Sequence, residues 1–391
     1  MNIAFFCIPA HGHTNPTLAV VRELTARGHT VRYYTTEAFR AKVEAAGAVF
    51  VPFDAEAARP GMTAADGARL GSDLTFSTKL IVDLTLAADD WLSRELTVHR
   101  PDVIVGDSMA FWAKLAAKKH GIPFVSSTTT FAFNRFSAKV IGQNGAGFLQ
   151  FLLAQPRINR QLKRLRAAGY AVKSVFDIIA NDNETETVVY TSPDFQPCAD
   201  TFSEKYHFVG PLLRPAQSSF EKLPGRSLIY ISLGTVNNDA LPFYRACLAA
   251  FGGDPRFQLV LSAGTQTDLA ALGPIPESCT VRASVDQMAV LDCADVFLTH
   301  CGMNSASEGL WHGLPLVLYP QTPEQHGVAN RVAALGAGVP LTAPSADGIR
   351  RAVETALTDP SYRENAQKLA DGFHRCGGAA EAADAIEHAA N

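Results

Sequence analysis

The chain has 391 residues, which is too long for one ordinary hydrophobic core and predicts two domains. Hydrophobic residues make up 47% and charged residues 18%, a balance typical of a well-packed globular protein. The formal net charge of −4 gives no electrostatic case for a nucleic-acid partner, so any phosphate would have to be bound locally.

The cysteines and the apolar segments favour a cytoplasmic protein. The seven cysteines are scattered and form no C-x-x-C pair, so we expect reduced thiols, no disulfide framework and no zinc site. The first residues lead straight into the apolar segment IAFFC without a basic stretch, and we therefore expect no signal peptide. No run reaches about 18 apolar residues, so we expect no integral membrane segment.

Helix, glycine and strand follow one another repeatedly along the chain. Units of this kind span residues 22–34, 44–53, 117–127 and 308–319. Strands such as DVIVGD and SLIYISLG are short and almost wholly apolar, which is typical of parallel strands buried on both faces. The alternation predicts an α/β fold made of two doubly wound, Rossmann-like domains.

This alternation stops at residues 211–226, which carry three prolines and no helical or strand period, and then restarts. We predict an N-terminal domain over 1–210, a linker over 211–226 and a C-terminal domain over 227–370. The Ala-rich tail, 371–391, is predicted to form a helix that packs back on the N-terminal domain. Ligands of doubly wound folds bind outside the carboxyl ends of the strands, where the loops described next occur.

Two histidines follow the first strand, in PAHGHTNPT, and a helix is predicted to begin near Thr17. A loop imidazole at His11 or His13 suits general-base chemistry near neutral pH, although both residues also fit ordinary surface histidines. Asp107 ends the strand DVIVGD and would orient such an imidazole, or simply cap the following helix. Nothing in the sequence shows that the two side chains meet.

Aromatic side chains in the same half suit an apolar ligand. Trp112, Phe131 and Phe133 would line an aromatic-binding pocket, and each fits core packing at least equally well. The segment at 148–166 is apolar and then strongly basic. It fits a membrane-surface contact or, more commonly, a helical hairpin with a solvated face, and Pro156 is expected to break any single helix.

The most informative motif is VFLTHCGMNSASEGLWHGLPLVLYPQTPEQ, which reads as strand, tight turn, helix and second strand. Backbone N–H groups at the start of its helix predict a phosphate site with His300, Gly302, Asn304 and Ser305, and Glu308 lies one turn further on. An ordinary N-cap at Asn304 or Ser305, with Glu308 completing a capping box, would explain the same residues.

Two further loops follow strands of this half. Ser232 and Thr235 offer hydroxyls beside Gly234, either for phosphate or as plain turn residues. Glu324 and Gln325 suit sugar hydroxyls, or mark another helix N-terminus. The motifs G-x-G-x-x-G after the first strand, P-loop, H-E-x-x-H, G-x-S-x-G and Asp-x-Asp are absent, so we expect no metal and no cofactor.

These motifs resemble those of inverting, nucleotide-sugar-dependent glycosyltransferases of the GT-B fold, the family of plant secondary-metabolite and bacterial macrolide glycosyltransferases. The resemblance spans nearly the whole chain, because the opening HGHTNPTLAVVRELTARGHTV, the later HFVGPLL and the strand ISLGT all match. LTHCGMNSASEGLWHGLPLVLYPQTPEQ matches the family's donor signature almost position by position.

The resemblance implies a role for each matched residue. His13 would deprotonate the acceptor hydroxyl, with Asp107 as its orienting carboxylate. The donor would be held by four sets of residues: His300, Asn304 and Ser305 on the diphosphate, Glu308 on the ribose, Glu324 and Gln325 on the sugar, and Ser232 and Thr235 near the phosphate or sugar.

The chain departs from the family at residues 283–291, where an aromatic residue commonly stacks on the uracil base. Ser284 stands in place of the aromatic residue and Asp286 in place of a proline, while Gln287 is retained. Ser284, Val285 and Gln287 are still expected to face the base, although losing the stack would weaken donor binding by roughly 1 kcal/mol or more. Uridine is the first expectation for the base, and thymidine stays open.

The resemblance therefore implies transfer of a hexose, first of all glucose, from a UDP-sugar to a hydroxyl of a small lipophilic, phenolic, polyketide or macrolide-like acceptor. Attack opposite the diphosphate would invert the anomeric carbon. Two other functions stay open: a nucleotide-sugar epimerase, which the H-T-N-P motif does not favour, and a non-catalytic nucleotide-binding protein, which only Ser284 suggests. The acceptor, its reacting O, N, S or C atom, the exact sugar and the oligomeric state also stay open.

Overall fold

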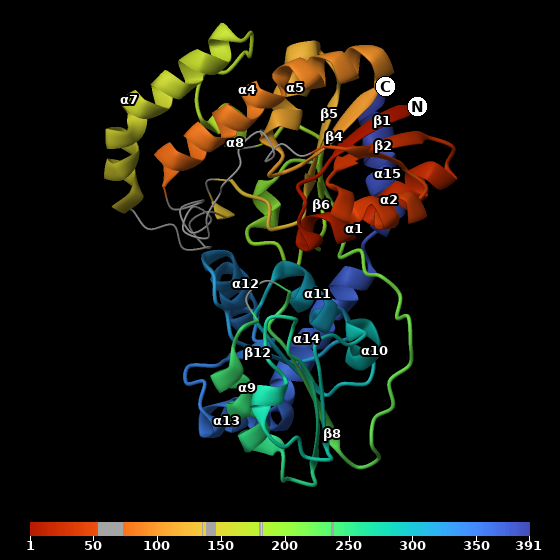
Figure 1. The fold of residues 1–391 in the computed structure, drawn as a ribbon, viewed down its shortest axis with the longest axis vertical. Helices are drawn as coiled ribbons and strands as arrows, with labels where there is room; N and C mark the ends of the chain where they lie inside the picture. The colour runs from red at the N-terminus through yellow and green to blue at the C-terminus, as the bar shows by residue number, and fades with distance from the viewer. Residues whose placement is uncertain (54–72, 135, 138–145, 180, 182, 236–237) are drawn as a thin grey trace. The chain divides into compact units, whose positions relative to one another are not determined.

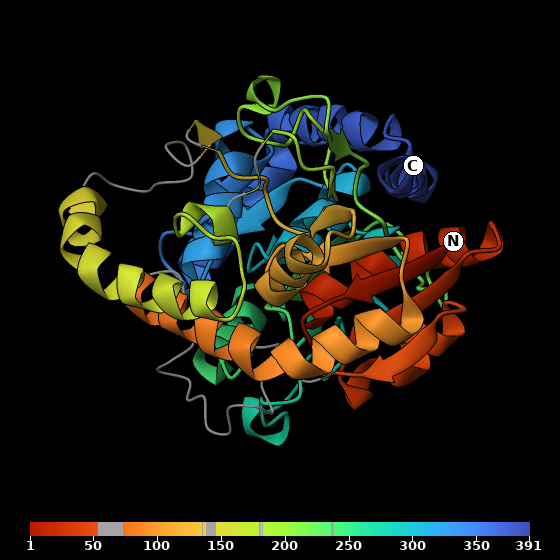
Figure 2. The same ribbon diagram turned by 90° about the horizontal axis from the view of Figure 1, so that it is seen from above.

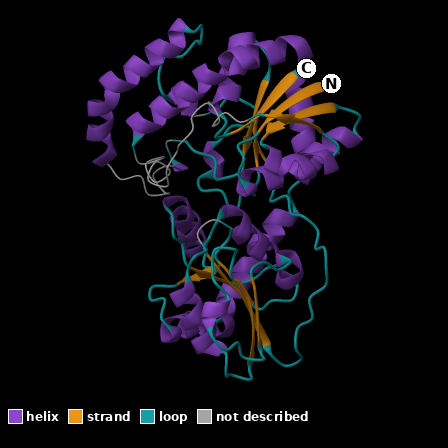
Figure 3. Ribbon diagram, viewed as in Figure 1, coloured by secondary structure: helices purple, strands orange, loops and turns teal. Residues whose placement is uncertain are grey.

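The computed structural model describes residues 1–53, 73–134, 136–137, 146–179, 181, 183–235 and 238–391. The chain divides into two compact units. The first contains Met1–Thr191, Cys198–Leu212 and Gly377–Asn391, and the second contains Ser192–Pro197 and Leu213–Cys376. Each unit is built on its own parallel sheet with helices around it (Figures 1 and 3).

The first unit holds a seven-stranded parallel sheet in the order β3-β2-β1-β4-β5-β6-β7. Its strands are β1 Asn2–Phe6, β2 Thr30–Thr35, β3 Val49–Pro52, β4 Val103–Asp107, β5 Phe124–Thr128, β6 Thr187–Val189 and β7 Tyr206–Phe208. Its helices are α1 His11–Ala26, η1 Glu37–Phe39, α2 Arg40–Ala45, α4 Leu74–His99, α5 Phe111–His120, α7 Ala146–Ala167, α8 Phe176–Ile179, η2 Ala199–Thr201 and α15 Gly378–Ala390.

Strands β1 and β2 show why this sheet is buried on both faces. Phe5 stacks on Tyr33 on one face and Phe6 stacks on Tyr34 on the other, because successive side chains of a strand point to opposite faces. The Phe5 face packs against α1 and α15, and the Phe6 face packs against α4 and α5. Helices therefore cover both faces, as expected for strands that are apolar throughout.

Helix α15 packs on the first unit, beside α1. Arg27, just past the end of α1, lies 2.6 Å from the Asp384 carboxylate of α15. Residues 371–374, which the sequence assigned to this last helix, instead end α14 in the second unit. The buried face of α15 is made of small side chains, Ala382, Ala383, Ala385 and Ile386.

Helix α1 begins earlier than predicted. The prediction of a loop that ends near Thr17 is wrong, because the backbone N–H groups of His13 and Thr14 already donate to the Ala10 carbonyl. Pro16 lies inside the helix, where its missing N–H removes one hydrogen bond of the early turns. Both histidines of the motif therefore lie in the first helical turn, directly after β1.

Helix α7 also departs from prediction. Pro156 does not break it, since α7 runs through this residue as one helix, and it lies along α4 in both views (Figures 1 and 2). Ile158, Leu162 and Leu165 are buried against α4, which compensates for the hydrogen bond that proline cannot make. This packing occupies the described apolar face of α7, so that face is not available to a membrane surface. The side chains of 148–153 lie outside the described residues.

The second unit holds a six-stranded parallel sheet in the order β10-β9-β8-β11-β12-β13. Its strands are β8 Ser227–Ser232, β9 Phe257–Ser262, β10 Cys279–Arg282, β11 Val296–Thr299, β12 Leu316–Leu318 and β13 Gly338–Pro340. Its helices are α9 Leu241–Phe251, η3 Ala270–Leu272, α10 Gln287–Leu291, α11 Met303–Trp311, α12 Pro323–Ala334, α13 Ala346–Thr358 and α14 Pro360–His374.

Most of the segment predicted as a linker, 211–226, belongs to the second unit. Asp286 Oδ2 accepts hydrogen bonds from the backbone N–H groups of Gln217 and Ser218, at 2.6 and 2.9 Å. The Asp286 carboxylate also lies 3.0 Å from Arg214. The aspartate that replaces the family's proline thus ties this extended segment to the start of α10.

Candidate active site

The structure brings His13 and Asp107 into contact in the first unit. Nδ1 of His13 lies 2.7 Å from Oδ2 of Asp107. His13 follows β1, and Asp107 ends β4, the strand beside β1 in the sheet. The carboxyl ends of two adjacent parallel strands therefore place the pair, at the edge where doubly wound folds bind ligands.

Asp107 holds the imidazole and does not cap the next helix. Its Oδ1 accepts the backbone N–H of Met109 at 2.8 Å, and the N-cap of α5 is Ala110. The Asp107 side chain is fully buried and that of His13 is 17% exposed. A buried carboxylate on one ring nitrogen orients the ring and stabilises the imidazolium, so Nε2 is the nitrogen suited to proton exchange.

A third residue of this site was missed in the sequence. Thr129 directly follows β5, the other neighbour of β4, and its Oγ1 lies 3.0 Å from Nδ1 of His13. The run SSTTT offers several hydroxyls at a strand end, and nothing in it distinguishes one threonine from the next. His11 is not part of this pair, since its ring packs edge-on against Phe39 at 5.0 Å.

The second unit carries the other histidine found at a strand end. His300 follows β11, and a Cβ atom added at Gly234 or Gly302 would lie 2.6 Å from its ring. Gly234 also has a φ of +80°, and Cys301 has a φ of +63°, which is uncommon for a residue with a side chain. A side chain at Gly234 or Gly302 would therefore collide with the His300 ring. The strained backbone of Gly234 and Cys301 lies directly beside this ring.

His300 is a neutral hydrogen-bonding group at physiological pH. Burial lowers the pKa of its imidazole to about 4, against a smaller opposing effect of the Ser232 backbone. Its Nδ1 atom is buried and has no hydrogen-bond partner among the described residues. The neutral ring can still exchange hydrogen bonds, because one of its nitrogens donates and the other accepts.

Helix α11 begins beside this ring. Its N-cap is Gly302, no described side chain caps it, and Asn304 and Ser305 lie in its first turn. The explanation of Asn304, Ser305 and Glu308 as an N-cap and capping box is therefore wrong. The backbone N–H groups and the positive end of the helix dipole favour an anion at this position.

Glu308 is held by a chain of hydrogen bonds. Tyr230 donates its hydroxyl to Oε1 of Gln287 at 2.9 Å, and Nε2 of Gln287 donates to Oε2 of Glu308. Burial raises the pKa of Glu308, and the bond from Gln287 opposes this effect. The retained Gln287 thus orients Glu308. Tyr230 escaped notice in the sequence because a tyrosine within an apolar strand resembles a core residue.

The other predicted donor residues follow strands of the same sheet. Ser232 ends β8, and its Oγ accepts the backbone N–H of Gly234 at 3.3 Å. Thr235 and Ser284 are exposed, and Val285 is half-buried. Their roles in donor binding stay predictions.

Glu324 and Gln325 begin α12 with different surroundings. Oε1 of Gln325 accepts the backbone N–H groups of Gln321 and Thr322, and its own N–H donates to Thr322 Oγ1, which forms a capping box. The alternative of a helix N-terminus therefore holds for Gln325, and a sugar contact would have to replace these bonds. Glu324 is exposed in the first turn.

The three aromatic residues predicted for an acceptor pocket differ in how far they are exposed to solvent. Trp112 and Phe131 are 6% and 3% exposed, so the structure places both in the core, which was the alternative for each. Trp112 packs against Phe53 with ring centroids 6.0 Å apart. Phe133 is 49% exposed and is the member of this set that an acceptor could reach.

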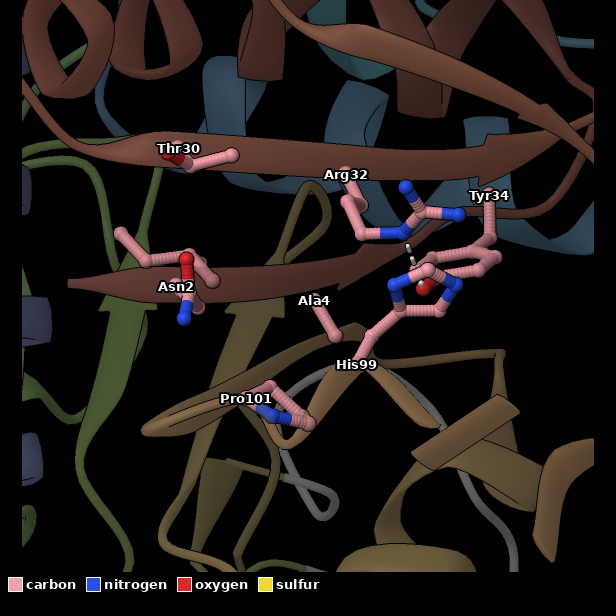
Figure 4. A pocket seen from close by; sticks show the side chains of 8 residues that line it. Asn2, Ala4, Thr30, Arg32, Tyr34, His99 and Pro101 are labelled. Atoms are coloured by element: carbon pink, nitrogen blue, oxygen red, sulfur yellow. Dashed lines mark hydrogen bonds between the residues drawn. The ribbon is translucent and has the colours of Figure 1, made fainter. Parts of the chain in front are cut away.

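A small pocket in the first unit lies at the starts of strands β1 and β2, and His13 and Asp107 do not line it. Asn2 and Thr30, at the starts of β1 and β2, line it together with Arg32 and His99 (Figure 4). Its volume of about 120 Å³ is smaller than the roughly 300 Å³ of a small-molecule site. The Arg32 guanidinium is already engaged, since it donates to the Tyr34 hydroxyl and pairs with Glu95.

Within the described ranges, no group of three His, Cys, Asp or Glu side chains is placed to hold a metal ion. All seven cysteines are free thiols. In the part of the chain that the structure describes, no helix is both long and apolar enough to span a bilayer.

Known proteins resemble this chain along its whole length. Residues 271–376 match the family described as "UDP-glucoronosyl and UDP-glucosyl transferase". NDP-glycosyltransferase YjiC of Bacillus licheniformis is 33% identical, with a match that covers 99% of this chain and 97% of that protein. Demethyllactenocin mycarosyltransferase of Streptomyces fradiae is 34% identical, with coverage of 99% and 86%.

A solved structure agrees with these sequence matches. The glycotransferase of kitacinnamycin superposes with a TM-score of 0.85 at 31% identity, over 99% of this chain and 98% of that chain. This coverage includes both units of the chain. The chain therefore belongs to the UDP-glucuronosyl and UDP-glucosyl transferase family and is a glycosyltransferase with the GT-B fold.

Proposed function

We propose that this enzyme moves a hexose, first of all glucose, from a UDP-sugar to a hydroxyl group of a small lipophilic or phenolic acceptor, with inversion of the anomeric carbon. The observation that carries the proposal is the 2.7 Å contact between His13 Nδ1 and Asp107 Oδ2. A histidine oriented in this way is suited to act as general base for a hydroxyl nucleophile.

In the proposed reaction the acceptor oxygen attacks the anomeric carbon on the face opposite the diphosphate. A carbon–oxygen bond to the acceptor forms as the bond to the diphosphate breaks, and the bonding electrons leave with the diphosphate. The acceptor proton passes to Nε2 of His13, and Asp107 stabilises the resulting imidazolium. One displacement of this kind inverts the configuration and requires no covalent sugar–enzyme intermediate.

The donor would be held by the second unit. The N–H groups that open α11, with the ring of His300, would bind the diphosphate and stabilise the charge that develops on it. The position of the His300 ring beside the start of α11 supports this role, since a Cβ added at the N-cap residue Gly302 would lie 2.6 Å from the ring. Glu308, oriented by Gln287, would accept hydrogen bonds from the ribose hydroxyls. We expect these groups to suffice without a metal ion.

The names of the relatives support the proposed acceptor class. One is named for demethyllactenocin and another for kitacinnamycin, which favours a natural-product acceptor here as well. Another relative is named simply as an NDP-glycosyltransferase, which leaves the nucleobase open. Ser284, exposed where an aromatic residue commonly stacks, makes discrimination between uridine and thymidine donors the first point to measure.

Mass spectrometry tests the proposal. Wild type is incubated with UDP-glucose and a panel of phenols and macrolides, beside His13→Ala and the matched control His11→Ala, which removes an exposed histidine outside the pair. We expect a product heavier by one hexose from wild type and from the His11 variant, and none from the His13 variant. Added chelator should leave the yield unchanged.

Three results would redirect the proposal. Product from His13→Ala at the wild-type rate would exclude His13 as the base. Conversion of the UDP-sugar without any acceptor would favour an epimerase. UDP binding by calorimetry without transfer to any acceptor would point to a different sugar or acceptor, and UDP donors that carry other sugars, tested on the same acceptor panel, would separate those two cases.

A further inference from the structure

We propose that Thr129 is a positioning residue for His13, an inference that rests on the proposed function of His13 as the base. Oγ1 of Thr129 lies 3.0 Å from Nδ1 of His13, and Oδ2 of Asp107 lies 2.7 Å from the same nitrogen. Both oxygens accept from one Nδ1–H, and the ring lone pair is then on Nε2, where an acceptor hydroxyl would need it.

The sheet fixes this arrangement. His13 follows β1, Asp107 ends β4 and Thr129 follows β5, and these three strands are consecutive neighbours. Thr129 is 3% exposed, so its hydroxyl cannot simply turn towards solvent. Asp107 is fixed in turn, because its Oδ1 accepts the backbone N–H of Met109. The imidazole is therefore held from two directions by buried oxygens.

The chemistry of the three groups decides which one carries the proton. A carboxylate only accepts hydrogen bonds, so the contact with Asp107 requires a hydrogen on Nδ1. A hydroxyl can donate or accept, and beside an Nδ1–H it must accept. Charged donors form the stronger hydrogen bonds, so the Thr129 oxygen favours the imidazolium over the neutral ring. Loss of this oxygen should make His13 a weaker base.

Other titratable groups surround the pair. Burial raises the pKa of the Cys7 thiol and of the Tyr190 hydroxyl, which keeps both neutral at physiological pH. His11 lies two residues before His13, and partial burial, with the nearby Lys42, lowers its pKa. A titration must therefore resolve His13 from His11, and site-specific signals are required.

Three variants isolate the hydroxyl. Thr129→Val removes it while keeping the shape of the side chain, and Thr129→Ser keeps it. Thr128→Val is the matched control, because Thr128 is equally buried in the adjacent position and its hydroxyl contacts Ser126 at 3.4 Å. Heat denaturation of all variants checks that the fold is retained.

The first measurement is the pH profile of kcat. Thr129→Val should lower the plateau of kcat about five- to tenfold, the factor that corresponds to one hydrogen bond, and leave KM unchanged. Its acidic limb should move to lower pH by about half a unit to one unit, since a weaker base loses its proton more easily.

Thr129→Ser and Thr128→Val should retain the wild-type profile. Equal acidic limbs in wild type and Thr129→Val would overturn the proposal, and a change in KM alone would assign Thr129 to substrate contact.

The second measurement does not depend on catalysis. Nitrogen-15 NMR of histidine-labelled enzyme, with His13→Gln used to assign the signal, reports the protonated nitrogen and the titration of His13. We expect an Nδ1–H tautomer in wild type and a lower titration midpoint in Thr129→Val. An Nε2–H tautomer, or unchanged titration, would overturn the inference. If no acceptor is ever glycosylated, the proposed function fails while this measurement still decides the role of Thr129.

Discussion

Two histidines stand at the ends of parallel strands in this protein, and their surroundings differ in kind. His13 faces a buried carboxylate and a buried hydroxyl, at 2.7 and 3.0 Å from its Nδ1. His300 lies in a cradle of two glycines, and its Nδ1 has no partner within the described residues. The first site is built to stabilise a charge on the ring, and the second is built to avoid one.

The difference teaches that surroundings decide what a histidine at a strand end can do. An adjacent carboxylate favours the imidazolium, which suits proton transfer. Desolvation without a charge partner favours the neutral ring, which can still donate from one nitrogen. In the proposed function, similar positions in two similar sheets would serve two separate steps, activation of the nucleophile and stabilisation of the leaving group.

The largest expected effect comes from breaking the first pair. His13→Ala and Asp107→Asn should each lower kcat by a factor on the order of 10² to 10⁴, because the base or its charge partner is lost. The affinity for UDP, measured by calorimetry, should stay within about twofold of wild type, since general-base loss does not touch the donor site. A parallel loss of UDP affinity would show that the two histidines do not act separately.

The neutral state of His300 predicts a stability change with pH. Its pKa is about 4 in the folded protein and about 6.5 when unfolded, so the unfolded chain binds the extra proton between these values. Stability linked to this ring is thus complete above pH 6.5 and falls by up to about 3 kcal/mol as pH drops to 4. Urea unfolding of wild type and His300→Gln over this range measures it. Parallel curves for the two proteins would contradict a depressed pKa.

A methyl group added at one of the two glycines beside His300 tests whether the close packing around this ring matters. Gly234→Ala adds a Cβ 2.6 Å from the His300 ring at a φ of +80°, so we expect a loss of about 1–3 kcal/mol in stability and a weaker UDP complex. Gly225→Ala is the matched control, since its φ is +73° and no described atom lies within 4 Å of the added Cβ. Equal effects of the two variants on UDP affinity would mean that the ring contact is unimportant.

The smallest effect concerns Glu308. Burial raises its pKa, so the folded protein favours the protonated carboxyl, and the stability this contributes is lost as pH rises above the unfolded value. Glu308→Gln mimics the protonated group, and we expect it to be slightly more stable than wild type near neutral pH. UDP should bind it about five- to tenfold more weakly, because an ionised acceptor for the ribose is lost. A variant less stable than wild type at pH 7 would argue against the raised pKa.

Much of the fold could be predicted because apolar strands and glycine-terminated helices are local patterns. The positions of His13 and Asp107 after predicted strands were sufficient to predict both as site residues, because the carboxyl ends of parallel strands lie at one edge of the sheet. Their contact could not be predicted, because it depends on β1 and β4 being neighbours although about a hundred residues separate them. Thr129 depends on the same sheet order through β5.

The points at which prediction and structure part have different origins, one in long-range packing and two in local helix-start patterns. Pro156 would break an isolated helix, but α7 is supported by side chains of α4 such as Ile81, which lie far away in the sequence. The predicted start of α1 near Thr17 was too late, since Pro16 lies inside the helix and not at the first position, where proline is common. Gln325 matched a sugar-binding motif and also a capping box, and sequence alone does not separate the two.

The second unit is nearly a single insertion within the first. The chain passes from one unit to the other after Leu212 and returns at Gly377, and apart from Ser192–Pro197 no other part of the second unit lies outside that interval. The first unit therefore draws β1 and α15 from opposite ends of the chain. One internal exchange of residues 213–376 would transplant all of the second unit except Ser192–Pro197, and with it the proposed donor site, and would leave both ends in place. A new acceptor module would instead require replacement at both ends, so we expect donor preference to be the easier property for recombination to change.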